Sequence, residues 1–302
     1  MRSLRKSSMY SRWPLHLMLL PGFIILFIYQ YVPIVGVSLA FQNFVPSLGL
    51  LGSKWVGWDN FSYMMALPNL YRVVWNTIYI SVLKVIAGLV FPILIAILLN
   101  EIRIQLVKRS IQTLIYLPHF LSWIILGGIL IDVLSPSSGI VNAMLGWVGI
   151  EPVFFLGEAK IFPYVLVGTD LWKDFGFSTI VYLAAISSIN PNLYEAAVVD
   201  GANRLRQIWH ITLPGMTPVI ILLATLSLGQ ILNAGFDQVF NLYNPSVYET
   251  GDIIDTLVYR MGIQQAKYSL ATAVGLFKSV VSFLLISLSY FLAYRLANYR
   301  IF

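Results

Sequence analysis

Three charged side chains lie close together in an otherwise apolar stretch of the chain. Asp170, Lys173 and Asp174 occur at positions i, i+3 and i+4, so on a helix they share one face and can neutralise one another. Such a cluster has two interpretations. It is a structural group of ion pairs inside a helix bundle, or it is one wall of a polar cavity. In a cavity, Trp172 and Tyr182 would offer aromatic faces on which a solute can stack.

Four more polar residues interrupt apolar stretches elsewhere. Lys84 and Lys278 lie six or seven residues inside the ends of their stretches, which on a helix is about 10 Å. Their long stems could extend to the membrane surface. If they and Lys173 instead face a common path, that path would favour an acidic solute. Gln230 and Asn233 are further candidates for the path, or for hydrogen bonds between helices.

The sequence holds no pattern for metal or nucleotide chemistry. Its three histidines, His16, His119 and His210, are far apart, and cysteine is absent, so we expect no metal site. No lysine follows a glycine, which excludes the phosphate-binding loop G-x4-G-K-[S/T]. We find no catalytic constellation, and we therefore expect neither a catalytic residue nor a bound cofactor on this chain.

Composition identifies the environment of these residues. Of 302 residues, 58% are hydrophobic and 11% are charged. Soluble domains average roughly 45–50% apolar and about 25% charged residues. These values exclude a disordered chain and argue against a soluble enzyme. The net charge of +6 would suggest nucleic acid as the partner of a soluble protein. In a membrane protein, the distribution of the positive charges indicates how the chain is oriented in the membrane, and no nucleic-acid partner is expected.

The elements that position the polar residues are long apolar windows, each of a length to cross a bilayer as a helix. We predict an all-α membrane protein with six transmembrane helices, the first of them a retained signal anchor. Together they form one transmembrane domain over residues 17–302. The windows are 17–41, 77–99, 111–134, 161–188, 217–236 and 272–297.

The distribution of basic residues predicts the orientation. With the N-terminal segment 1–16 in the cytoplasm, eleven of the nineteen Lys and Arg residues fall on the cytoplasmic side and five on the other. Cytoplasmic loops hold the excess of positive charge in membrane proteins. We therefore predict a multi-pass protein of the bacterial cytoplasmic (inner) membrane with both termini in the cytoplasm, and with the loop 189–216 on the same side.

This loop has readable local structure. Asn190 can cap a helix that has Pro191 in its first turn, and Gly201 can end that helix in a left-handed conformation. A second short helix is predicted over 202–210, with a break at Leu213 to Gly215 before the fifth span. Without further information the loop could be an amphipathic connector at the membrane surface.

The same loop contains a long motif. The residues follow the pattern E-A-A-x3-G-x9-I-x-L-P, which resembles the EAA motif of permease subunits of ABC importers. The fixed positions are Glu195, Ala196, Ala197, Gly201, Ile211, Leu213 and Pro214. The chain as a whole is similar to the type I (MetI-like) permeases of binding-protein-dependent sugar importers. The stretches 20–22 and 31–44 resemble the branch that imports oligo- and polysaccharides. In such an importer, Trp172 and Tyr182 would offer faces on which a sugar ring can stack. A path that Lys84, Lys173 and Lys278 face would favour an acidic saccharide such as a uronate oligomer.

The resemblance implies a mechanism and a set of partners. The motif would form a coupling helix that docks on an ATP-hydrolysing subunit. The contact residues would be Glu195, Ala196, Ala197, Asp200, Gly201, Arg204, Leu213 and Pro214. Two such subunits would hold ATP and Mg, a second permease would complete the pore, and an extracytoplasmic solute-binding protein would deliver the saccharide. A heterodimer of permeases is favoured over a homodimer.

Other classes of membrane protein remain as alternatives at this stage. An ion-coupled secondary transporter would favour matched repeats and broken helices at the bilayer midplane. We see Pro92 and the pair Gly127-Gly128, but no matched halves. A polytopic membrane enzyme would need a catalytic constellation, and a simple channel would have no use for the coupling loop.

Overall fold

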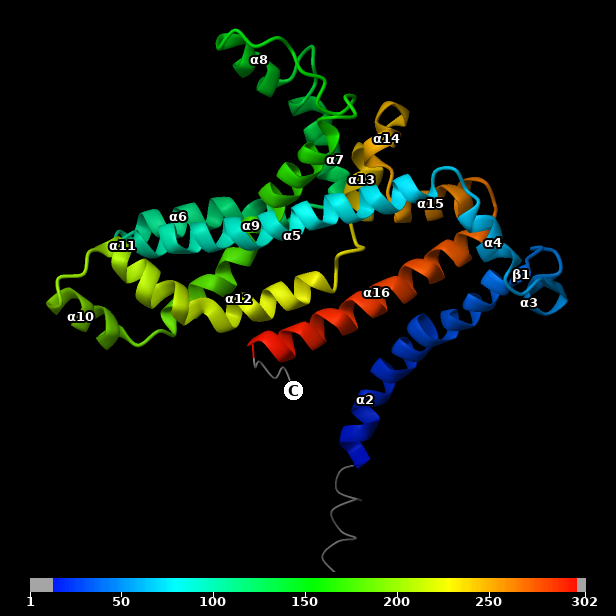
Figure 1. Ribbon diagram of the computed structural model, residues 1–302, viewed down its shortest axis with the longest axis horizontal. Coiled ribbons are helices and arrows are strands. Elements are labelled where there is room, and N and C mark those ends of the chain that lie inside the picture. The colour runs from blue at the N-terminus through cyan, green and yellow to red at the C-terminus, as the bar shows by residue number, and fades with distance from the viewer. Residues whose placement is uncertain (1–12, 298–302) are drawn as a thin grey trace, which may run out of the picture. The chain divides into compact units, whose positions relative to one another are not determined.

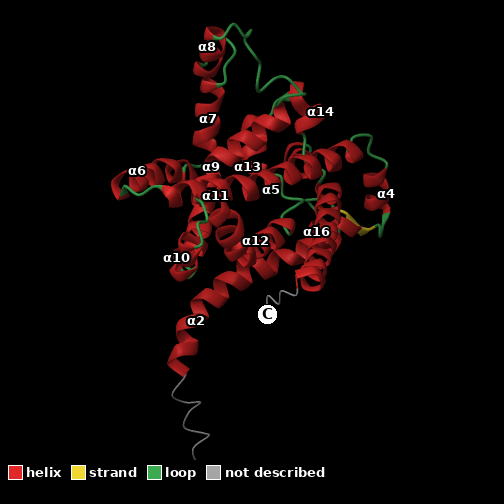
Figure 2. Cartoon of the chain, turned by 60° about the vertical axis from the view of Figure 1, so that its left-hand side comes forward, coloured by secondary structure: helices red, strands yellow, loops and turns green. Residues whose placement is uncertain are grey.

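The computed structural model describes residues 13–297, and nearly all of these residues are helical (Figures 1 and 2). They pack as two units, which we describe separately. The first unit comprises residues 13–67 and 258–276, and the second comprises 68–257 and 277–297. Most of the predicted cytoplasmic segment 1–16, and the last five residues of the chain, lie outside the described residues.

The first unit begins with an apolar helical run that changes its winding twice. Helix α2 (Trp13–Leu26) continues as a π turn, η1 (Phe27–Tyr31), and then as a 3-10 segment, η2 (Val32–Phe41). A short antiparallel ribbon, β1 (Gln42–Asn43) with β2 (Lys54–Trp55), follows. The remaining elements are α3 (Gly49–Gly52), α4 (Asp59–Met65), η6 (Arg260–Gln264) and the start of α16 (Tyr268–Ala297).

The second unit contains the long helices α5 (Leu70–Glu101) and α9 (Phe162–Ser187) and the loop helix α10 (Pro191–Val199). Between α5 and α9 lie α6 (Gln105–Tyr116), η3 (Leu117–Phe120), α7 (Trp123–Val133) and α8 (Ile140–Trp147). After α10 come α11 (Arg204–Gln207), η4 (Ile208–Thr212), α12 (Leu213–Leu228), α13 (Phe236–Leu242), η5 (Pro245–Val247), α14 (Tyr248–Gly251) and α15 (Ile254–Tyr259).

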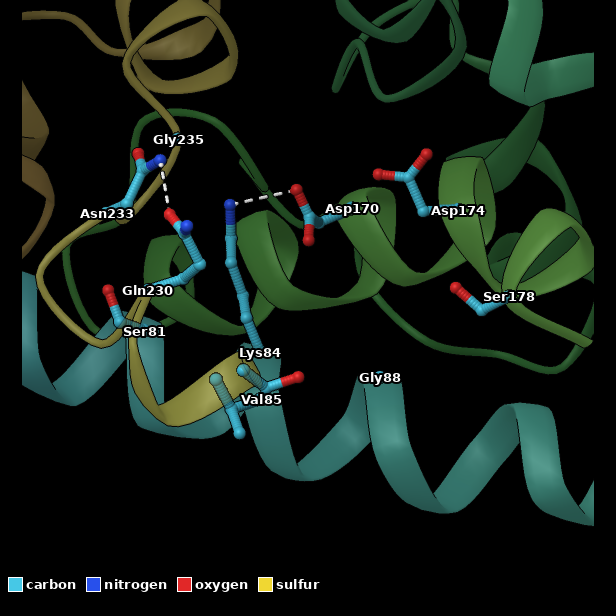
Figure 3. A pocket seen from close by; sticks show the side chains of 11 residues that line it. Ser81, Lys84, Val85, Gly88, Asp170, Asp174, Ser178, Gln230, Asn233 and Gly235 are labelled. Atoms are coloured by element: carbon cyan, nitrogen blue, oxygen red, sulfur yellow. Dashed lines mark hydrogen bonds and ion pairs between the residues drawn. The ribbon is translucent and has the colours of Figure 1, made fainter. Parts of the chain in front are cut away.

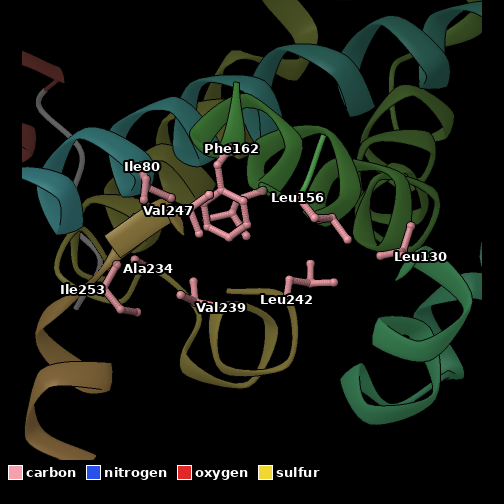
Figure 4. Close-up of a cluster of buried hydrophobic side chains, with 10 residues drawn as sticks. Ile80, Leu130, Leu156, Phe162, Ala234, Val239, Leu242, Val247 and Ile253 are labelled. Carbon is pink, nitrogen blue, oxygen red and sulfur yellow. The ribbon is translucent and has the colours of Figure 1, made fainter. Parts of the chain in front are cut away.

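Helices α5 and α9 lie side by side and form the centre of this unit (Figure 1). A core of buried apolar side chains joins them to α7, α13 and the segments around them (Figure 4). Phe162 is fully buried there, and Gly251 lies against its ring so closely that a Cβ would come within 2.4 Å of it. Gly176 of α9 similarly lies against the carbonyl of Ile115 in α6. Glycine at these two positions therefore allows the close approach.

By length and composition, four helices among the described residues could cross a membrane, or five if one bent pair counts as a span. The four are His16–Phe41, Leu70–Glu101, Arg204–Leu228 and Tyr268–Leu288. Helix α9 coincides with the fourth predicted window, although it holds three charged residues. This helical architecture is compatible with six spans, a number that stays a prediction.

Two windows differ from the prediction of straight, separate helices. The third window bends by 106° between Phe120 and Trp123, where Ser122 caps the new helix by accepting a hydrogen bond from Ile125 N–H. In the fifth, the predicted break at Leu213 to Gly215 is wrong, because the helix runs on from Arg204 to Leu228. Proline removes a donor and crowds the preceding turn of a helix. Here the wider π turn η4 directly precedes Pro214 and accommodates it.

Candidate functional site

A polar cavity of about 400 Å³ opens beside α5, α9 and the end of α12 (Figure 3). Its volume is within the range of small-molecule sites. It is lined by Ser81, Lys84, Val85, Gly88, Asp170, Asp174, Ser178, Ser227, Gln230, Asn233 and Gly235. On α5 the lining positions recur at i, i+3, i+4 and i+7, so one face of that helix borders the cavity.

Lys84 is the central cation of this cavity, and its side chain is only 9% exposed. The amine lies 3.0 Å from Asp170 Oδ1 and donates a hydrogen bond to the Ala234 carbonyl at 2.8 Å. It also donates to Gln238 Oε1. The Gln238 amide in turn donates to the hydroxyl of Thr169 at 2.7 Å. The amine thus joins α5, α9 and α13, and all three of its acceptors come from distant parts of the chain.

Gly235 closes one side of the cavity. Its backbone adopts a left-handed conformation with φ of +88°, and a Cβ at this position would lie 3.0 Å from the Lys84 amine. An L side chain would therefore meet both backbone strain and the buried cation. Glycine here lets the chain turn from the end of α12 into α13 directly over Lys84.

A second polar cluster lies where the third window bends. His119 Nδ1 is 2.7 Å from Asp174 Oδ1, and the imidazole stacks on Phe177 with ring centroids 4.1 Å apart. Lys173 donates a hydrogen bond to the His119 carbonyl at 2.6 Å, and its amine lies 5.8 Å from the centre of the Trp123 ring. This cluster attaches the bent connection to α9 and leaves Asp174 at the cavity wall.

The structure groups the predicted path residues differently from the sequence. Five of them line the cavity, namely Lys84, Asp170, Asp174, Gln230 and Asn233. The predicted mutual neutralisation on α9 is confirmed for Lys173 and Asp174, whose amine and carboxylate lie 3.9 Å apart, and is wrong for Asp170, which pairs with Lys84. Extension of Lys84 to the membrane surface is also wrong, since its amine points into the bundle.

Four predicted residues lie away from this cavity. Trp172 lies on another face of α9 and is 45% exposed. Tyr182 is buried in an apolar cluster with Met216. Lys173 contacts the bent connection described above, and Lys278 pairs with Asp255 at 2.5 Å. This ion pair neutralises the Lys278 amine within the protein, so the side chain does not need to extend to the membrane surface.

Several functional positions escape analysis of the sequence alone. Ser81, Gly88 and Ser178 line the cavity, and Gln238 holds the Lys84 amine. The sequence does contain a signal for Ser81 and Gly88, because they recur with Lys84 at helical spacing along an apolar window. No local signal points to Gln238, which lies 154 residues from Lys84.

The loop after α9 forms the predicted short helix. Asn190 caps α10 by accepting a hydrogen bond from Asn192 N–H at 3.0 Å. At its other end Gly201 has φ of +75°, Gly201 N–H donates to the Val198 carbonyl, and Ala202 N–H donates to the Ala197 carbonyl at 2.8 Å. These two bonds are those of a Schellman motif, which satisfies the last carbonyls of a helix.

Few contacts within the chain cover this helix. Glu195 and Ala196 are exposed, and Val198 and Val199 are 61% and 87% exposed. The hydroxyl of Tyr194 lies 2.9 Å from that of Thr212, which joins α10 to the base of the next long helix. The loop thus presents a small apolar surface on a helix whose two ends are fixed.

Together these features describe a membrane protein with a polar interior cavity and an exposed helix on a loop between two long helices. Within residues 13–297, no group of three or more His, Asp and Glu residues could hold a metal ion. The arrangement can bind a polar solute through a cation, carboxylates, hydroxyls and amides, and it can contact another protein through α10. A transport protein has both features.

The family follows from sequence comparison. Residues 88–301 match the family described as "Binding-protein-dependent transport system inner membrane component", and the chain belongs to it. It is therefore a permease subunit of such a system, a multi-pass protein of the inner membrane. The EAA motif identified in the sequence agrees with this assignment.

Two proteins of Bacillus subtilis are similar to the chain over most of its length. The chain is 42% identical, over 95% of its length and 90% of the relative, to "Polygalacturonan/rhamnogalacturonan transport system permease protein YteP" of Bacillus subtilis. It is also 42% identical to Protein LplB of the same organism, over 91% of this chain and 86% of that one.

Two solved structures have the same fold. One is a chain of a bacterial ABC transporter involved in the import of the acidic polysaccharide alginate, with a TM-score of 0.88 and 40% identity over 96% of this chain and 98% of that one. The other is a bacterial alginate ABC transporter in complex with alginate pentasaccharide-bound periplasmic protein, with a TM-score of 0.88 and 39% identity over 98% and 99%.

Proposed function

We propose that this permease imports an acidic oligo- or polysaccharide as part of an ATP-driven ABC importer. The observation that supports this most directly is the agreement between its similar proteins. A polygalacturonan/rhamnogalacturonan permease and an alginate importer are both about 40% identical to the chain over nearly its full length. Both names describe polymers that contain uronic acids.

The cavity supports a role in the substrate path. Asp170 balances the charge of Lys84 inside the bundle. A uronate carboxylate could replace Asp170 as the partner of this amine. Ser81, Gln230 and Asn233 would then offer hydrogen bonds to sugar hydroxyls. A change of ion-pair partner allows the solute to bind two conformations of the protein with different affinity, as transport requires.

The loop helix supports coupling to an ATPase. The residues of the EAA motif around Glu195, Ala196 and Ala197 would dock on an ATP-binding subunit, with Asp200 and Gly201 ending the helix and Arg204 beside it. Leu213 and Pro214 begin α12, so movement of the loop would pass directly to a long helix.

The partners follow from this assignment. Two ATP-binding subunits would hold ATP and Mg, and a second permease, a paralogue of this chain, would complete the pore. A solute-binding protein would deliver the saccharide from the outer side of the membrane. Both termini and the loop 189–216 would lie in the cytoplasm, in accordance with the distribution of basic residues.

Reconstitution tests this function. The chain, a second permease, the ATP-binding subunits and the binding protein are placed together in lipid vesicles, and ATP hydrolysis is measured. We expect stimulation by oligogalacturonate-loaded binding protein and none by the binding protein with a neutral oligosaccharide of equal length. Equal stimulation by both sugars would overturn the acidic substrate, and no stimulation by any loaded binding protein would overturn the importer.

A further inference from the structure

A second cavity lies at the N-terminal ends of α5 and α9, and the transport path proposed above does not use it. Its volume is about 560 Å³. It is lined by Arg72, Trp75, Asn76, Tyr79, Lys160, Pro163, Tyr164, Glu249 and Thr250. In the predicted orientation all of these residues belong to the outer half of the protein. Two cations and three aromatic rings are thus gathered at one end of two long helices.

The walls of this outer cavity are fixed by hydrogen bonds. The Asn76 amide donates to the carbonyls of Glu249 and Asp252, at 3.1 and 3.2 Å. The hydroxyls of Tyr79 and Tyr164 lie 2.9 Å apart and join α5 to α9. These bonds within the protein hold the cavity walls together, as in the largely preformed sites that bind small molecules.

Its two cations have no protein anion as a partner. Within residues 13–297, neither the Arg72 guanidinium nor the Lys160 amine forms an ion pair, although Glu249 lines the same cavity. Both side chains are exposed. An anion that enters the cavity would therefore meet two free cations, and one hydroxyl of the Tyr79–Tyr164 pair would remain as a further donor.

An apolar groove continues from this cavity along the same two helices. It is lined by Leu83, Ile86, Ala87, Val90, Phe91, Tyr164, Val167, Gly168 and Leu171, so Tyr164 belongs to both. On α5, Tyr79, Leu83, Ile86 and Val90 recur every three or four residues and share a face. Trp75 borders the outer cavity, and Lys84 borders the polar cavity described above. These two residues are nine positions apart on α5, about two and a half turns, so the two cavities lie on opposite faces of this helix.

We propose that the outer cavity and this groove together bind one molecule of an anionic phospholipid with a glycerol headgroup. Arg72 and Lys160 bind the phosphate, Glu249 accepts a hydrogen bond from the headgroup hydroxyls, and an acyl chain lies in the groove. Basic pockets between membrane helices bind anionic headgroups in this manner. Along α5 the groove extends about 12 Å from Leu83 to Phe91, close to the roughly 15 Å of one bilayer leaflet. An acidic saccharide would use the cations but not the apolar groove.

Native mass spectrometry of the purified permease complex tests the proposal. The complex is exchanged into vesicles of phosphatidylglycerol and phosphatidylcholine in equal amounts, extracted, and scored for retained lipid. We expect selective retention of phosphatidylglycerol. The double variant Arg72→Gln/Lys160→Gln should lose it by roughly twentyfold, because each cation near an anionic lipid contributes about fivefold. A matched control, Lys54→Gln/Lys267→Gln, removes two exposed cations of the first unit and should retain the lipid.

A second variant separates the acyl chain from the charge. A Cβ at Gly168 would meet no atom within 4 Å, so Gly168→Leu places an apolar side chain in the groove without a clash at its Cβ. It should lower retention while both cations remain. Unchanged retention in both variants, or equal retention of phosphatidylcholine, would overturn the proposal. It would also be overturned if oligogalacturonate displaced the lipid, or if Gly168→Leu separated the two permeases, since the occupant would then be the saccharide or the second permease.

Discussion

The loop helix α10 and the cavity around Lys84 differ in how their polar groups are satisfied. In α10 both helix ends are satisfied by residues within the loop itself, and its side chains remain exposed. In the cavity, the Lys84 amine depends on three acceptors that lie 86, 150 and 154 residues away. The loop is therefore locally stable and free to contact a partner, whereas the cavity exists only when α5, α9 and α13 are packed together.

The largest expected effect comes from breaking the ion pair of the cavity. Lys84→Met leaves Asp170, whose side chain is 28% exposed, without its cation, which should cost about 3 kcal/mol of stability, the lower end of the range for a buried pair. The double variant Lys84→Met/Asp170→Asn should recover much of this loss. The measurement is the midpoint of thermal unfolding of the purified protein in detergent, with the exposed Lys54→Met as control. If the single and double variants unfold alike, the two side chains are not coupled.

A smaller effect is expected at the end of the loop helix. Gly201→Val places a β-branched residue at φ of +75°, a strain of about 1–3 kcal/mol that the chain can relieve by shifting the end of α10. We expect ATP hydrolysis in the reconstituted complex to lose most of its stimulation by loaded binding protein. Gly201→Asn is the control, since asparagine tolerates this conformation. Normal stimulation in the valine variant would exclude a coupling role for this helix end.

The cap at the other end of α10 has a still smaller expected effect. Asn190→Ala removes the acceptor for the Asn192 N–H and should destabilise the helix by about 1 kcal/mol. Amide hydrogen exchange over residues 191–199 should become about fivefold faster, while exchange in α5 stays constant. Asn192→Ala, which changes an exposed side chain of the same helix, is the matched control. Equal exchange in both variants would contradict the capping role.

The smallest effect on stability is expected at Arg204. Its guanidinium lies 3.9 Å from Glu101, and both side chains are largely exposed, so Arg204→Gln should change stability by less than about 0.5 kcal/mol. If Arg204 contacts the ATP-binding subunit, the same variant should weaken assembly of the complex, and more so at low salt. Unchanged binding of the ATP-binding subunit in a pull-down titration would show that this arginine only faces solvent.

Prediction from sequence succeeded where interactions are local. The cap at Asn190, the turn at Gly201 and the helix between them were all predicted, because each depends on neighbours within four or five residues. Along α12 the same reasoning failed. Pro214 indicated a break, but it lies inside a continuous helix, Arg204–Leu228, that includes a π turn before it.

The substrate-path residues show the limit of spacing as evidence. Asp170, Lys173 and Asp174 share a helix face, yet their main partners are Lys84, the His119 carbonyl and His119 Nδ1. The bend of 106° in the third window brings His119 to α9, and the apolar pattern of that window did not predict the bend. Lys278 likewise was expected at the membrane surface or the path and instead pairs with Asp255.

The sequence by itself determined that this chain is a helical membrane protein with an importer's coupling motif. Hydropathy, helix caps and the EAA pattern are properties of contiguous residues, and they do not depend on how the helices pack. Only the tertiary structure decided which charges neutralise one another and which faces of α5 border a polar cavity or an apolar groove. The physical reason is that a buried charge must find a partner in space, and that partner can lie anywhere along the chain.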